Sequence, residues 1–405
     1  MTGGAAGRAA GFTAPLLLCL AGCQTNVGDA GCRINKQIAL APTPLTQLRD
    51  ARLEPVGDDF VLIGHDDTAV RWAPVGWATG LGSEQALPLP AGARNPTYAL
   101  GGKGAPGDTV HVGVILDAAG GTDAELRLIT VPVAGPTTAG PGEALVTFVG
   151  QAGMNPAVAL GSSRPGIKTG VTWVDAADGT VRFLAVDGDG AAVGSPTVLD
   201  AAYSIACLGF SPGKGDTNVT YQRFPAADAR PEWMISEVSD IDIGTFMTWS
   251  LPVAEIGSPM SCGVVAPTPT GYAVAWQDTT GSWISIQTAM TRHVENVGFA
   301  SATDFGGPDV QPPIVAVAPF ETGEAQPDGG TQAVDFGIVF ARTRAVEVWR
   351  LNGSGTRRPG ALILPSMDGN LGKPSAVVVN KSLIITYADY TASSGRRLVV
   401  DASCQ

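Results

Sequence analysis

The feature that most constrains the fold of this chain is a short pattern that recurs along most of its 405 residues. In five copies an alternating, mostly apolar run ends in an aromatic residue, one further residue and a polar turn former, as in residues 171–175 (VTWVD) and 385–389 (ITYAD), and two weaker copies end at Asp66 and Asp117. Repeats of such a period indicate one supersecondary unit used many times. Seven copies, 47 to 64 residues apart, end at Asp66, Asp117, Asp175, Arg223, Asp278, Arg342 and Asp389.

Each copy lies within the same order of short apolar segments. The clearest unit has segments at residues 156–160, 170–174, 180–186 and 197–199, separated by turn signals such as Asp178-Gly179. Alternating apolar runs bounded by turn residues are typical of antiparallel strands. The third segment recurs at residues 69–75, 125–131, 232–238, 282–288, 345–351 and 397–403.

Four-stranded units repeated around an axis predict an all-β, seven-bladed β-propeller of four-stranded antiparallel blades. Composition agrees, because 53 glycines and 30 prolines disfavour long helices, while 44% hydrophobic residues provide a large core. We predict that residues 35–405 form this propeller as a single domain.

The two ends of the chain are expected to close the ring. The last unit ends after its third strand, at Gln405, while residues 35–41 (NKQIALA) form a strand-like segment outside any unit. We predict that this segment supplies the missing fourth strand and brings Cys32 beside Cys404. Such closure resembles that of WD-repeat and related propellers, although no unit carries both the GH and the WD dipeptide of true WD repeats.

The N-terminal residues carry a localisation signal. Leu20-Ala21-Gly22-Cys23 follows an apolar stretch, residues 12–20, that is too short to span a bilayer. This run resembles the lipobox of bacterial lipoproteins, including repeat-containing lipoproteins of unassigned function. The resemblance implies a signal peptide at residues 1–22, lipid on Cys23, a linker at residues 23–34 and a membrane-anchored protein of the bacterial cell envelope. Gln24, in place of Asp, favours the outer membrane.

Four further cysteines remain after the predicted signal peptide and Cys23. An even set in an exported chain indicates disulfides, and four cysteines allow three pairings. We expect Cys32 to pair with Cys404 across the ring closure, and Cys207 to pair with Cys262 because both lie in matching first strands of adjacent units. A zinc site is disfavoured, since the chain has no CxxC and its three histidines are far from any cysteine in the sequence.

Aspartates at the ends of second strands form the candidate ligand face. In a propeller they would lie around one face, where they could bind a cation or a basic ligand. The favoured interpretation is structural, because aspartate caps turns and because Arg71, Arg127 and Arg182 follow at the same place in the third strand. The aspartates are Asp66, Asp117, Asp175, Asp278 and Asp389.

Other motifs indicate structure rather than chemistry. Asp187-Gly188-Asp189-Gly190 resembles part of a calcium loop, but the twelve-residue pattern is missing, so a hairpin turn is favoured and no cofactor is expected. Residues 102–107 match GxGxxG without a following helix. Four tryptophans at repeat positions are expected in the core: Trp72, Trp173, Trp276 and Trp349.

The function classes can be narrowed from charge and motifs. A net charge of −12 argues against nucleic acid as a partner. The sequence has no HExxH motif, and we assign no catalytic residue. We expect a monomeric binding or scaffolding module for a protein, peptide or glycan. The alternative is a propeller enzyme, a hydrolase or lyase acting on a polysaccharide or lactone through carboxylates at the channel mouth.

Overall fold

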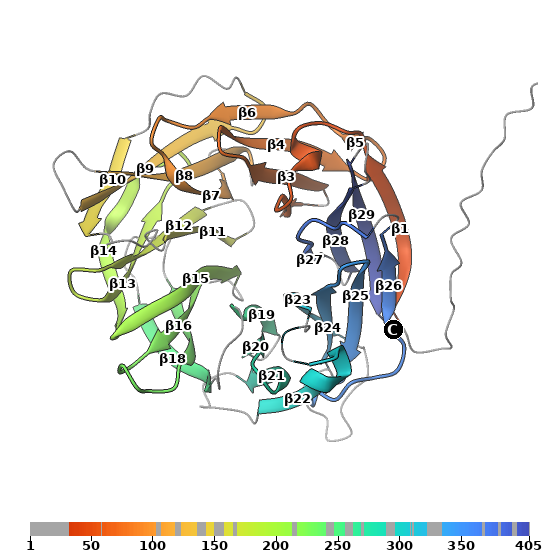
Figure 1. The fold of residues 1–405 in the computed structure, drawn as a ribbon. Coiled ribbons are helices and arrows are strands. Elements are labelled where there is room, and N and C mark those ends of the chain that lie inside the picture. Colours follow the sequence, from red (N-terminus) through yellow and green to blue (C-terminus); the bar gives the residue numbers. More distant parts are fainter. Residues whose placement is uncertain are drawn as a thin grey trace, which may run out of the picture.

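The computed structural model describes most of the chain after residue 31. The described residues are 32–57, 59–102, 107–117, 123–135, 143–149, 158–164, 168–212, 217–239, 247–255, 262–268, 271–288, 296–307, 309, 312–321, 334–366, 369–379, 382–390 and 395–404. Within them, seven antiparallel sheets stand in a ring, so the chain is a seven-bladed β-propeller, as predicted (Figure 1). No helix in this part of the chain is long and apolar enough to cross a membrane.

Blades 1 to 3 follow one another along the chain. Blade 1 contains β2 (Arg52–Val56), β3 (Asp59–His65), β4 (Ala69–Gly76) and β5 (Gly80–Leu81), and β6 (Gln85–Pro88) also pairs with β4. Blade 2 contains β7 (Arg94–Gly101), β8 (Thr109–Asp117), β9 (Asp123–Pro132) and β10 (Glu143–Val149). Blade 3 contains β11 (Val158–Arg164), β12 (Lys168–Asp175), β13 (Thr180–Val186) and β14 (Ala192–Ala201).

Blades 4 to 6 repeat the same order. Blade 4 contains β15 (Ser204–Pro212), β16 (Thr217–Phe224), β17 (Glu232–Ser239) and β18 (Met247–Glu255). Blade 5 contains β19 (Val264–Thr268), β20 (Gly271–Gln277), β21 (Gly281–Thr288) and β22 (Asn296–Ser301), followed by the 3₁₀ turn η3 (Ala302–Phe305). Blade 6 contains β23 (Ile314–Glu321), β24 (Val334–Ala341), β25 (Ala345–Leu351) and β26 (Leu362–Pro365).

Blade 7 closes the ring with both ends of the chain. It contains β27 (Ser375–Val379), β28 (Ser382–Tyr390), β29 (Gly395–Cys404) and, as its fourth strand, β1 (Cys32–Leu40). The first residue of β1, Cys32, is the register partner of Cys404, and Leu40 is the partner of Arg397. The predicted closure is confirmed, and β1 begins three residues before the predicted domain start at residue 35 (Figure 1).

The core is a ring of apolar layers between blades. One layer joins Val61 and Trp72 of blade 1 to Tyr98 and Val112 of blade 2, and similar layers lie between the other neighbours. Both faces of each sheet are therefore covered, which explains why the second and third strands are nearly continuous apolar runs. The four tryptophans predicted for the core are buried: Trp72, Trp173, Trp276 and Trp349.

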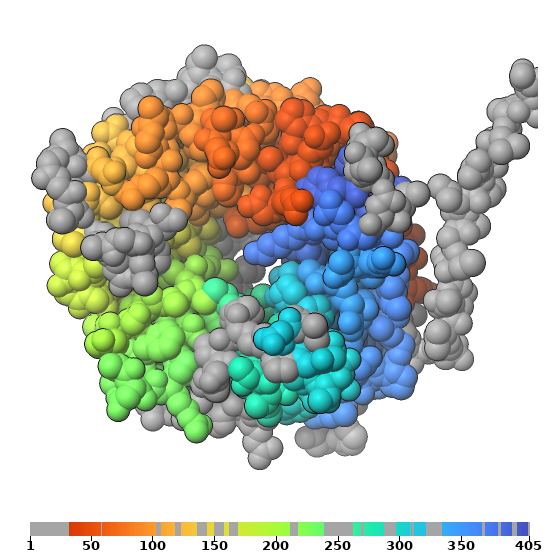
Figure 2. All heavy atoms as spheres, viewed as in Figure 1, coloured from red at the N-terminus to blue at the C-terminus, as the bar shows by residue number. Residues whose placement is uncertain are grey.

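The antiparallel order gives the ring two different faces. The turns that join second to third strands, after β3, β8, β12, β16, β20, β24 and β28, lie at one end of the axis, which we call the hairpin face. Links from one blade to the next return to this end, and η1 (Leu45–Gln47) lies in the link from β1 to β2. Cys32 lies at the opposite face, because β1 starts where β29 ends. The space-filling view shows a hollow at the centre of the ring (Figure 2).

Candidate functional site

The five predicted aspartates lie on the hairpin face of five different blades. Each one stands at or next to the last pair of residues between a second and a third strand, as in the pairs Asp175–Thr180 and Asp389–Arg396. Their hydrogen-bond and ion-pair partners lie in the same blade or in the link that leads into it, so the structure spreads these side chains around the face. Among the described residues, no group of three histidine, cysteine, aspartate or glutamate side chains is placed to hold a metal ion.

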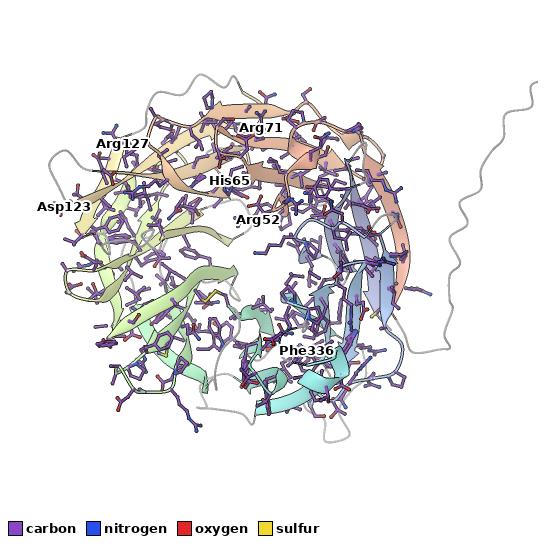
Figure 3. All side chains as sticks on the ribbon, in the orientation of Figure 1. Arg52, His65, Arg71, Asp123, Arg127 and Phe336 are labelled. Carbon is purple, nitrogen blue, oxygen red and sulfur yellow. A yellow bond between two sulfur atoms is a disulfide. The ribbon has the colours of Figure 1, made fainter. Side chains whose placement is uncertain are left out.

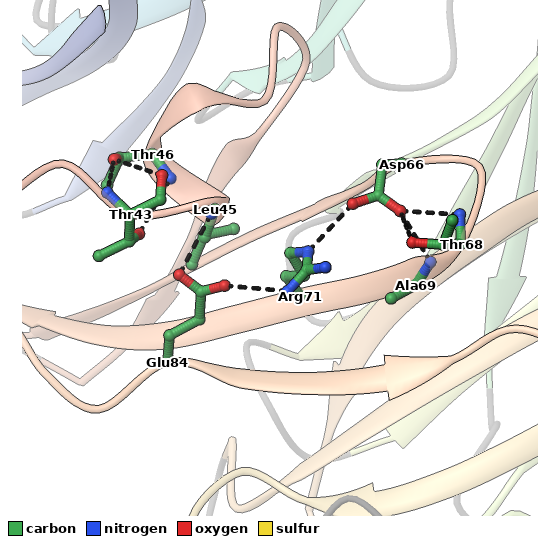
Figure 4. Close-up of polar contacts among 8 residues, drawn as sticks. All are labelled: Thr43, Leu45, Thr46, Asp66, Thr68, Ala69, Arg71 and Glu84. Carbon is green, nitrogen blue, oxygen red and sulfur yellow. Dashed lines mark hydrogen bonds and ion pairs between the residues drawn. The ribbon is translucent and has the colours of Figure 1, made fainter. Parts of the chain in front are cut away.

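Asp66 organises the hairpin of blade 1 (Figure 4). One carboxylate oxygen accepts hydrogen bonds from the backbone N–H of Thr68 at 2.7 Å and of Ala69 at 2.9 Å, and the other pairs with Nε of Arg71 at 3.0 Å. Arg71 continues to Glu84 at 3.3 Å, and Glu84 accepts the N–H of Leu45 in η1 at 3.2 Å. Partial burial raises the pKa of Asp66, but these hydrogen bonds outweigh it and hold the pKa well below its usual range.

The same turn chemistry recurs in blades 3 and 5. Asp178 accepts the N–H of Thr180 at 3.1 Å, and Asp278 accepts the N–H groups of Thr280 at 2.7 Å and Gly281 at 3.1 Å. Arg182 pairs with Asp175 at 3.4 Å and with Asp178 at 2.6 Å. These carboxylates therefore cap turns, which is the usual role of aspartate at such positions.

In blade 2 the expected pairing of Asp117 with Arg127 is wrong. Arg127 pairs with Glu125 at 3.1 Å, and Asp117 pairs with Arg94. Arg127 is the register partner of Val114, three residues from Asp117, whereas Arg182 faces Trp173, two residues from Asp175. Successive side chains of a strand point to opposite sides of the sheet. The offset of three residues therefore puts Asp117 and Arg127 on opposite sides, while the offset of two residues puts Asp175 and Arg182 on the same side.

Asp389 is the most enclosed of the five. It has no solvent exposure, accepts a hydrogen bond from Oγ of Ser366 at 2.5 Å and pairs with Arg396 at 3.3 Å. The hairpin predicted at Asp187 is also formed, because its carboxylate accepts the N–H groups of Asp189 and Ala191, both at 2.9 Å. Carboxylates used in this way stabilise the turns of the propeller.

The cysteines of the propeller follow the predicted pairing where it can be seen. Cys207 and Cys262 form a disulfide with their Cα atoms 5.4 Å apart, which links β15 to the residues just before β19. Cys32 is also disulfide-bonded and lies opposite Cys404, whose side chain is outside the described part of the chain. Residues 1–31, including Cys23, are outside it as well, as are residues 103–106 of the GxGxxG match.

A different group of side chains, which we call the axial cluster, consists of Arg52, His65 and Tyr98. Arg52 and His65 lie at the inner edge of blade 1 (Figure 3), and both contact Tyr98 of blade 2. The guanidinium of Arg52 lies over the Tyr98 ring at 4.7 Å and donates from Nη2 to the Tyr98 carbonyl at 2.7 Å. Nε of Arg52 pairs with Glu54 at 2.7 Å. The edge of His65 packs on the Tyr98 ring, with centroids 5.9 Å apart.

Several polar atoms of the axial cluster have no partner among the described residues. They are Nη1 of Arg52, the hydroxyl of Tyr98 and Nδ1 of His65. The Arg52 side chain is 40% exposed. Burial raises the pKa of Tyr98, which keeps its hydroxyl protonated and able to donate at neutral pH.

A buried arginine adds positive charge behind this cluster. Arg397 in β29 is fully buried and donates to the carbonyl oxygens of Thr46 at 3.3 Å, Leu48 and Ala51 at 2.9 Å. Burial lowers its pKa to about 10, so it stays protonated at neutral pH. Arg49, nearby in the chain, lies over the Tyr390 ring at 5.4 Å.

Sequence reasoning missed the axial cluster, although one signal was present. The first strand of blade 1, RLEPV, carries two charged residues, while β15 and β19 read SIACLGFSP and VVAPT and β27 reads SAVVV. First strands stand nearest the axis (Figure 1). The first strands β7, β11 and β23 carry one charged residue each, so the pair of charges in β2 was the signal for this cluster.

Comparison with known proteins shows distant similarity to the folds of solved structures. No protein-family model and no curated protein sequence matches the chain. A Trypanosoma rangeli sialidase in complex with sialic acid is 11% identical, with a TM-score of 0.43, and the match covers 91% of this chain and 57% of the sialidase. The β-propeller domain of the Trilobed protease from Pyrococcus furiosus is 10% identical, with a TM-score of 0.43, covering 86% of this chain and 93% of that domain.

A prolyl endopeptidase structure is similarly distant, at 10% identity and a TM-score of 0.44. That match covers 88% of this chain and 45% of the peptidase. This chain thus spans about half the length of the sialidase and of the peptidase. Structural similarity at 10 to 11% identity gives no information about the activity of this chain.

Proposed function

We propose that this chain is a lipid-anchored binding module of the bacterial cell envelope, whose propeller recognises a protein, peptide or glycan through its hairpin face. The observation that carries the proposal is the contrast between the aspartates of that face and the axial cluster of blades 1 and 2. The aspartates are engaged in turn caps and ion pairs, whereas the axial cluster keeps donors without partners. Free donors bind ligands, while carboxylates held in structural bonds are poorly placed to act as an acid and base pair.

The topology supports the same proposal. Residues 23–31 separate the lipobox cysteine from β1. Such a segment reaches about 30 Å when extended. Because β1 starts on the face opposite the hairpins, an anchor at Cys23 leaves the hairpin face accessible to a partner. An exposed aromatic side chain, Tyr203, lies on that face in the link from β14 to β15 and is 69% exposed.

Anchoring is tested by lipid labelling in a bacterial host. Cys23→Ser should abolish incorporation of labelled fatty acid and block release of the signal peptide. Cys19→Ser, in the preceding apolar stretch, is the matched control and should label as the unchanged chain does. Equal labelling of the two variants would contradict the anchoring part of the proposal.

Binding is tested with the full chain in detergent against a panel of envelope peptides and glycans, with affinity measured by interferometry. Tyr203→Ser on the hairpin face should weaken binding several-fold. Ile363→Ser is the control, since Ile363 is 57% exposed but lies on the outer strand β26. Turnover of a glycan or lactone that Asp175→Asn abolishes without unfolding the chain would instead establish the enzyme alternative.

A further inference from the structure

In the axial cluster, cationic and neutral donors meet without enough acceptors. Around the Tyr98 hydroxyl, the charges of Arg52 and Arg397 favour a negative group, and those of Asp50 and Glu54 oppose it. Two guanidinium groups and two carboxylates therefore balance at this position, in a chain whose net charge is −12.

We propose that the axial cluster binds the carboxylate group of an anionic ligand, which rests on and deepens the proposed binding function. Nη1 of Arg52 would donate to one carboxylate oxygen and the Tyr98 hydroxyl to the other. Glu54 and the Tyr98 carbonyl occupy Nε and Nη2, so they hold the guanidinium plane in place and leave its remaining edge for the ligand. Charge-assisted hydrogen bonds from arginine to carboxylate are among the stronger polar contacts in proteins.

The cluster is held rigidly enough to recognise a ligand. The Tyr98 ring is 5% exposed and is held between Arg52 on one side and His65, whose ring lies edge-on to it. Arg397 fixes the link from β1 to β2, directly before Arg52, through three backbone carbonyls. A ligand therefore meets donors that are already oriented, which lowers the entropic cost of binding.

The blade-2 pair Arg127–Glu125 supplies a matched control. It has the same two-residue spacing as Arg52–Glu54 and a similar contact, 3.1 Å, but it lies in the third strand of its blade. The guanidinium of Arg127 is in an ion pair with Glu125, and its contacts with the described residues include no tyrosine hydroxyl. Arg127→Gln thus removes an equal charge and leaves the axial cluster unchanged.

The test measures the thermal unfolding midpoint of the full chain in detergent at constant ionic strength. The probes are sodium glucuronate with glucose as its neutral counterpart, and N-acetyl-leucine with N-acetyl-leucinamide. At least one carboxylate should raise the midpoint above its neutral counterpart. Arg52→Gln should abolish this difference, Tyr98→Phe should reduce it several-fold, and Arg127→Gln should retain it. A response to glucuronate alone indicates an acidic glycan, and a response to N-acetyl-leucine alone indicates a peptide C-terminus.

Two outcomes would overturn the inference: no difference between carboxylates and neutral probes, or an unchanged difference in both axial variants. If Arg52→Gln fails to fold, Tyr98→Phe decides, because it removes one oxygen and keeps the buried ring. A chain that binds a macromolecular partner but neither carboxylate refutes this inference and leaves the proposed function standing.

Discussion

Replacing Arg397 by methionine tests whether the ring is locked where its two ends meet. Arg397 is fully buried in β29 and donates to the carbonyls of Thr46, Leu48 and Ala51, which precede the first blade. Methionine fills a similar volume but donates nothing, so three carbonyls lose their donor. The variant should therefore loosen the link from β1 to β2.

The expected cost follows from two opposing contributions. Each buried carbonyl left without a donor costs about 1 to 2 kcal/mol, which gives about 3 to 6 kcal/mol for three. Removing a buried charge returns part of this, because the desolvation penalty of the guanidinium disappears, and we expect a net loss of about 3 kcal/mol in the free energy of unfolding. Arg397→Lys, which keeps the charge and fewer donors, should lie between the two chains.

The assay is urea unfolding followed by tryptophan fluorescence, since buried tryptophans lie in several blades. Arg33→Met is the control: Arg33 is exposed on β1 of the same blade and should change the free energy of unfolding by less than about 0.5 kcal/mol. A loss for Arg397→Met no larger than that of Arg33→Met would refute the reasoning. Such a result would mean that the ring closes through β-strand pairing alone.

Three further predictions follow from local contacts. Burial lowers the pKa of His111 to about 4, while a histidine in the unfolded chain titrates near 6.5, so the unfolded state binds more protons between these two pH values. The free energy of unfolding should therefore fall by about 2 kcal/mol from pH 7.5 to pH 5. In urea unfolding, His111→Gln should lack this fall of about 2 kcal/mol. Replacing Cys207 and Cys262 by alanine should lower the free energy of unfolding by about 2 to 4 kcal/mol. Peptide mapping of the unchanged chain under non-reducing conditions should recover the two cysteines as a linked pair, and free thiols at these positions would contradict the disulfide. Asp175→Asn should cost about 1 kcal/mol in the same assay and leave ligand affinity unchanged, because Asp175 pairs with Arg182 at a partly exposed site; a loss of affinity without a loss of stability would show a role in binding.

Much of the architecture could be predicted from residues close together in the sequence. Strand alternation and turn residues act over a few positions, so the third strands at residues 180–186 and 345–351 were predicted with the bounds that the structure gives. Bulges were harder to predict, because register shifts next to Arg182 and Ala185 let β14 run from Ala192 to Ala201, well beyond the predicted residues 197–199.

The candidate site was predicted less well, because its contacts depend on register and on neighbouring blades. The pairing of Arg71 with Asp66 follows the expected cross-strand rule, while Arg127 does not reach Asp117 because it is offset by an odd number of residues. The Arg52 and Tyr98 side chains meet although they are 46 residues apart in the sequence.

The sequence by itself determined the ring of seven blades and its closure, because period, alternation and turn chemistry are local and repeat along the chain. Only the tertiary structure decided which polar groups remain available. Asp389, at the end of a repeat like the other aspartates, proved fully buried, while Arg52 kept an unpartnered nitrogen in a guanidinium that lies over the Tyr98 ring. The physical reason is that a hydrogen bond needs both partners at a set distance and angle, and blades placed side by side, rather than neighbours in sequence, supply or withhold the second partner.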